Sequence, residues 1–123
     1  MTAQEIVNLA VVTLDKKKAE DIVVLDISEL SSLGTHFVIA SANSTTQVRA
    51  LTGEVEDALK KVGESPLHVE QKERGTRWTL IDYGSVVVHI FYKETREFYN
   101  LEKLWADAKR QDVNKILELQ KNK

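Results

Sequence analysis

Apolar positions along the first half of the chain predict a helix, two strands and a second helix, in that order. Apolar side chains recur every three to four positions over residues 2–14 and 43–62, the spacing of one buried helix face. The runs at 22–27 and 36–40 are rich in apolar, β-branched residues, which is typical of strands covered on both faces. Gly63 marks the end of the second helix.

The second half of the chain predicts a meander of three strands, at 66–72, 78–82 and 86–92, with a hairpin turn at 83–85. The order of elements requires one crossover through the second helix, so parallel strands are expected in the sheet. The sequence therefore predicts an α/β fold, a single domain with a mixed sheet of about five strands flanked by helices.

The C-terminal part of the chain is more polar than the part before it. After Thr95 the pattern predicts a turn and a short helix, which ends the main domain at residues 1–108. The remaining segment, 109–123, is predicted to be a polar C-terminal helix or tail.

Composition narrows the classes of protein that fit this pattern. A chain of 123 residues without cysteine suits one domain in a reducing compartment, and it excludes thiolate chemistry and disulfides. No apolar run approaches the roughly 20 residues that cross a bilayer, and no leader pattern is visible, so we expect a cytoplasmic protein without membrane contact. A net charge of −2 argues against a general polyanion binder.

Motifs for catalysis or cofactor binding are missing from the sequence. There is no serine elbow, no glycine-rich phosphate loop and no Asp-x-Asp pair for two-metal chemistry. The histidines, His36, His68 and His89, fall on three different predicted strands, which disfavours a metal site. We therefore expect no enzyme activity, no metal and no cofactor.

One stretch, from Trp78 to Trp105, holds both tryptophans, all three tyrosines and two of the three phenylalanines. It also holds polar residues that a plain core does not need. Among them, His89 is flanked by apolar residues, which favours a neutral, hydrogen-bonded structural imidazole over an acid or base. Core packing and interface contact both remain open for Tyr99, Leu101, Leu104 and Trp105.

Several ordered blocks of the sequence are similar to the Iojap family of bacterial ribosomal silencing factors. The resemblance extends from the N-terminal helix to about Ala108. The matching blocks are VVLDISELSSL at 23–33, FVIASANSTTQVRAL at 37–51, GTRWTLIDYG at 75–84 and VVVHIFYKETREFYNLEKLW at 86–105.

The resemblance implies a fold like that of nucleotidyltransferases but without their catalytic carboxylates, and a function without catalysis. Members of the family bind the large ribosomal subunit through ribosomal protein L-fourteen, block joining with the small subunit and repress translation in nutrient limitation. The residues that match the family pattern, and whose exposed subset we expect to contact the partner, are Trp78, Asp82, Tyr83, His89, Phe91, Arg96, Tyr99, Leu101 and Trp105.

Other functions stay open on the sequence alone. The main alternative is a nucleotide- or RNA-binding module of nucleotidyltransferase-like fold, although residues 82–107 carry more acids than bases. A peripheral contact of the basic segment 109–123 with ribosomal RNA, and a homodimer formed through the aromatic stretch, are further hypotheses.

Overall fold

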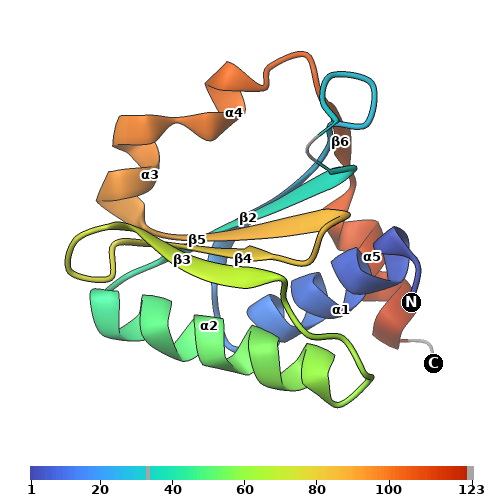
Figure 1. The fold of residues 1–123 in the computed structure, drawn as a ribbon, viewed down its shortest axis with the longest axis horizontal. Coiled ribbons are helices and arrows are strands. Elements are labelled where there is room, and N and C mark those ends of the chain that lie inside the picture. The colour runs from blue at the N-terminus through green and yellow to red at the C-terminus, as the bar shows by residue number, and fades with distance from the viewer. Residues whose placement is uncertain (33, 122–123) are drawn as a thin grey trace.

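A six-stranded mixed sheet forms the centre of the molecule (Figure 1). The structure is a computed structural model, and it describes residues 1–32 and 34–121. The strands lie in the order β3-β4-β5-β2-β1-β6. Their bounds are Glu20–Asp26 for β1, His36–Ala42 for β2, His68–Glu73 for β3, Trp78–Asp82 for β4, Val86–Tyr92 for β5 and Lys109–Gln111 for β6.

The two central strands, β2 and β5, are parallel, and every other neighbouring pair in the sheet is antiparallel. Their register runs from His36 opposite Val86 to Ala42 opposite Tyr92. Between them the chain forms α2 and then the β3–β4 pair before it returns to the centre of the sheet. The predicted crossover and the predicted parallel pairing are therefore confirmed.

Three helices cover one face of the sheet: α1 at Ala3–Lys16, α2 at Thr45–Lys60 and α5 at Val113–Lys121 (Figure 1). The first two begin where the sequence predicted, because Thr2 forms a capping box with Glu5 and the Ser44 hydroxyl accepts the backbone N–H of Gln47. Valine, leucine, isoleucine and alanine side chains fill the space between helices and sheet, and this is the larger of two cores.

The second face of the sheet has a thinner cover, made by α3 at Lys93–Tyr99 and α4 at Leu101–Leu104 (Figure 1). A second, smaller core lies beneath these helices and consists of Leu25, Ile27, Phe37, Ile39, Trp78, Val87 and Phe91. Alternation along β4 sends Trp78 to this core and Ile81 to the larger one.

The sheet has one strand more than the approximate number that the sequence predicted. Strand β6 pairs antiparallel with β1, with Lys109 opposite Asp26 and Gln111 opposite Val24. The following helix, α5, buries Ile116 in the larger core. Residues 109–121 therefore contain both a strand of the sheet and a packed helix. None of the described helices is long and apolar enough to cross a lipid bilayer.

Candidate functional site

Burial separates the residues that match the family pattern into two groups. Buried side chains are those of Trp78, Tyr83, His89, Phe91 and Arg96. Asp82, Leu101 and Trp105 are partly exposed, and Tyr99 is 41% exposed. Only exposed side chains can contact a partner. The predicted contact residues that meet this condition are Asp82, Tyr99, Leu101 and Trp105.

The predicted residues do not all lie on one face. Tyr83 packs into the core under α1 and α2, opposite the aromatic cluster, and burial raises the pKa of its phenol to about 12. Asp82 is at the far end of β4, where its carboxylate accepts the backbone N–H of Gly84 at 2.7 Å and fixes the hairpin turn. Both residues therefore have structural contacts away from α3 and α4.

The other predicted aromatic residues meet on the second face of the sheet. Trp78 stacks on Phe91 with ring centroids 4.7 Å apart and contacts Tyr99 at 4.8 Å. Trp105, which follows α4, meets Phe37 edge to face at 5.4 Å. These pairs join α3, α4 and the sheet, so the aromatic residues of this segment serve largely as the packing between the two layers.

His89 lies inside this cluster and accepts a hydrogen bond at Nδ1 from Trp78 Nε1 at 3.2 Å. Burial, with a smaller contribution from the positive charge of Lys72, lowers the pKa of its imidazole to about 3. The ring is therefore neutral, and the bond from Trp78 places its proton on Nε2. That atom is buried, and nothing in the described part of the chain hydrogen-bonds to it. The geometry gives His89 a structural role in the core.

An exposed apolar surface lies on the outside of α3 and α4. It consists of Phe98, 81% exposed, Leu104, 75% exposed, and Tyr99, and we call it the α3–α4 surface. Phe98 meets Tyr99 edge to face at 5.1 Å. Large apolar side chains exposed together in this way make the α3–α4 surface the candidate site for contact with another molecule.

Two shallow hollows flank the α3–α4 surface. One has a volume of about 410 Å³ and is lined by Arg77, Tyr92, Glu94, Thr95, Phe98 and Tyr99. The other, about 570 Å³, is lined by Glu97, Phe98, Tyr99, Asn100, Lys103 and Leu104. Each hollow thus combines an aromatic wall with one carboxylate and one cationic side chain, the composition of a protein interface with an apolar centre and a polar rim.

Phe98 is not among the predicted contact residues, and the sequence is compatible with both core packing and interface contact for Leu104. The orientation of α3 explains why Phe98 is exposed. This helix buries Thr95 and Arg96, the polar residues, and turns Phe98 toward solvent. A hydrophobicity pattern assigns the apolar side chains to the core, so the sequence offered no signal for the reversed arrangement.

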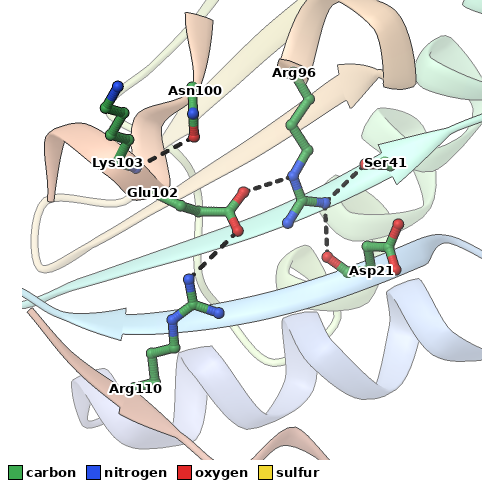
Figure 2. Close-up of polar contacts among 7 residues, drawn as sticks. All are labelled: Asp21, Ser41, Arg96, Asn100, Glu102, Lys103 and Arg110. Carbon is green, nitrogen blue, oxygen red and sulfur yellow. Dashed lines mark hydrogen bonds and ion pairs between the residues drawn. The ribbon is translucent and has the colours of Figure 1, made fainter. Parts of the chain in front are cut away.

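Arg96 connects α3 to two strands of the sheet and to α4 (Figure 2). Its Nη1 donates to the backbone oxygen of Asp21 at 2.6 Å and to Ser41 Oγ at 2.7 Å. Its Nε donates to Glu102 Oε1, on α4, at 2.8 Å. The other oxygen of Glu102 lies 3.6 Å from Arg110 Nη2, on β6. The side chain of Arg96 is 10% exposed, so its guanidinium makes its contacts inside the protein and not with solvent.

Fold and surface together define a class: a small α/β domain that presents an exposed aromatic and aliphatic face on its thinner layer. A family model described as "Ribosomal silencing factor during starvation" matches residues 1–123, and the chain belongs to this family.

Individual relatives agree with this assignment. A protein of Halalkalibacterium halodurans named ribosomal silencing factor RsfS is 44% identical over 108 residues, which cover 88% of this chain and 92% of that protein. The crystal structure of a Chromobacterium violaceum protein superimposes with a TM-score of 0.81 at 40% identity, covering 86% of this chain and 88% of the other. A mouse protein named mitochondrial assembly of ribosomal large subunit protein 1 is 32% identical over 103 residues, 81% of this chain and 45% of its own length.

Proposed function

We propose that this protein binds the large ribosomal subunit in the cytoplasm through ribosomal protein L-fourteen and prevents the small subunit from joining. In this mechanism the protein represses translation by occupying space at the joining face, and it does so without catalysis. The family's description as a silencing factor during starvation supports repression under nutrient limitation. The mouse relative supports the choice of subunit, because its name refers to the ribosomal large subunit.

The observation that carries this proposal is the α3–α4 surface. Phe98 and Leu104 are large apolar side chains held almost fully in solvent, where they cost free energy until a partner covers them. Aromatic side chains at the centre of an interface are also the ones that most often dominate its affinity. The flanking hollows, each with one carboxylate and one cation, provide polar contacts at the rim.

Sedimentation of ribosomal subunits tests the proposal directly. Purified large and small subunits are mixed under joining conditions with and without the protein, and gradient fractions are probed for it. We expect the protein to migrate with the large subunit and the peak of joined ribosomes to shrink. If the protein stays at the top of the gradient while the subunits join normally, the proposal is wrong.

Substitutions on the α3–α4 surface test whether this is the face that binds. We expect Phe98→Ala to weaken binding to the large subunit by about 2 kcal/mol, roughly 30-fold in Kd, and Leu104→Ala and Tyr99→Ala to weaken it in the same direction. Leu67→Ala is the matched control for Leu104→Ala, since Leu67 is 73% exposed but lies just before β3. Equal affinities for the Leu104 and Leu67 variants would show that another face binds.

A further inference from the structure

We infer that Arg96 is the positioning residue of the α3–α4 surface: acting through Glu102, it sets the angle at which α3 and α4 present their apolar side chains. This inference rests on the proposed function, because it assigns Arg96 a role in docking. The role is indirect, since Arg96 is buried while the side chains that would meet the partner are exposed.

Apolar packing holds α3 and α4 to the sheet through only a few partly buried side chains, namely Tyr99, Leu101 and Trp105. Helix α3 buries only Thr95 and Arg96, and α4 buries no side chain. A helix on a sheet is ordinarily anchored by an apolar stripe, and here the apolar residues of both helices include the exposed ones of the α3–α4 surface. Polar contacts therefore add to this limited apolar packing in fixing the two helices over the sheet.

The corner between α3 and α4 shapes one of the two hollows beside the α3–α4 surface. Asn100 adopts a left-handed conformation with φ 46° and ψ 61°, which ends α3 and starts α4. Its side chain accepts the backbone N–H of Lys103 at 3.3 Å. The hollow of about 570 Å³ at this corner has walls from both helices, including Phe98 and Leu104. The shape of the hollow consequently depends on the angle between α3 and α4.

Arg96 is the residue that fixes the angle between α3 and α4. Its bond to Glu102 spans the corner from α3 to α4, and its bonds to Asp21 and Ser41 tie the same guanidinium to β1 and β2 (Figure 2). The guanidinium donates from two separate nitrogens, Nε and Nη1, held in one rigid plane, a geometry that the single nitrogen of a lysine ammonium does not reproduce. Asp21 itself has a φ of 49°, so its carbonyl is turned out of the regular strand pattern at the point where β1 is irregular.

If Arg96 orders the corner, its loss lowers the fraction of molecules whose surface is ready to bind. The measured Kd then rises by the same factor by which that fraction falls. This relation separates positioning from general stability, because it links affinity to local order at residues 97–105.

The experiment compares Arg96→Gln, Arg96→Lys and Glu102→Gln with wild type, using hydrogen exchange of the free protein and binding to purified large subunits. Two variants serve as controls. Arg110→Gln removes only the longer, more exposed ion pair with Glu102, and Ile116→Ala destabilises the opposite layer. Glu102→Gln keeps the test informative if either Arg96 variant fails to fold.

We expect the Arg96 and Glu102 variants to lose amide protection at 97–105 while β5 stays protected, and to lose affinity at least tenfold by the same factor. The two controls should keep wild-type affinity. Lost protection with unchanged affinity would overturn the inference, and so would lost affinity with unchanged protection, which would make Arg96 a direct contact. If wild-type protein does not bind the subunit, the proposed function fails and the docking role with it, while exchange still shows whether Arg96 orders the corner.

Discussion

Burial decides what the ionisable side chains of the aromatic segment do. His89 and Arg96 are both buried, but burial holds the imidazole of His89 neutral, whereas the guanidinium of Arg96 donates hydrogen bonds to three acceptors. Neither side chain is placed to meet a partner. The polar residues of this segment therefore organise the exposed surface from beneath.

The buried imidazole of His89 predicts a dependence of stability on pH. Its pKa is about 3 in the folded protein and near the ordinary value of 6.5 in the unfolded chain. As the pH falls below 6.5, the unfolded state takes up a proton that the folded state does not, so the free energy of unfolding decreases until about pH 3. We expect wild type to lose stability more steeply over this window than His89→Gln, measured by urea denaturation at a series of pH values.

His68→Gln is the matched control for this measurement. His68 is an exposed histidine on β3, so its substitution removes one imidazole without changing the core. Other groups, such as Asp26, whose pKa is lowered by hydrogen bonds from Ser28, contribute equally to all three proteins. Parallel stability profiles for wild type and His89→Gln would contradict the prediction.

At the scale of elements, the sequence predicts the bounds of strands best where alternation and turn signals coincide. The bounds of β4 and β5 match the predicted strands at 78–82 and 86–92, because apolar runs flank a clear turn. Strand β6 was not predicted, since its residues, Lys109 to Gln111, are all polar and pair with β1 through the backbone. Backbone pairing at a sheet edge leaves no hydrophobic pattern to detect.

Helix α5 gives a direct test of whether the C-terminal segment is part of the folded unit. Ile116 is 7% exposed and packs into the larger core, whereas Leu119, on the same helix, is 65% exposed. We expect Ile116→Ala to lower the free energy of unfolding by about 2 kcal/mol or more, and Leu119→Ala to change it by less than about 0.5 kcal/mol. Chemical denaturation measures both, and similar small effects would mean that α5 is not anchored.

For the whole molecule, the two layers differ in what they do. The layer of α1, α2 and α5 buries most of the apolar core, while the layer of α3 and α4 carries the exposed surface. The sequence predicted the mixed sheet and its helices, and its family resemblance was confirmed. It did not predict which aromatic residues are exposed, because Trp78 and Phe98 are equally apolar in sequence and only the packing of α3 distinguishes them.

The low net charge and the apolar α3–α4 surface predict how binding to ribosomal subunits depends on salt concentration. A net charge of −2 and the apolar character of the α3–α4 surface leave little positive charge to neutralise phosphates. A protein with six or more phosphate contacts loses roughly a thousandfold in affinity between 50 and 200 mM salt. We expect a loss of less than about tenfold for this protein over that range. A steep dependence, measured by equilibrium binding, would instead favour the RNA-binding alternative.

The pairing of the first strand with the last has a practical consequence for anyone who handles this protein. Because β6 lies beside β1 and α5 packs on α1, the first and last helices lie together on the face of the sheet opposite α3 and α4 (Figure 1). Affinity tags, fluorescent reporters or surface tethers attached next to α1 or α5 therefore leave the α3–α4 surface uncovered. The packing of the last helix on the first also makes the chain a good subject for circular permutation, with new ends opened in the β3–β4 turn.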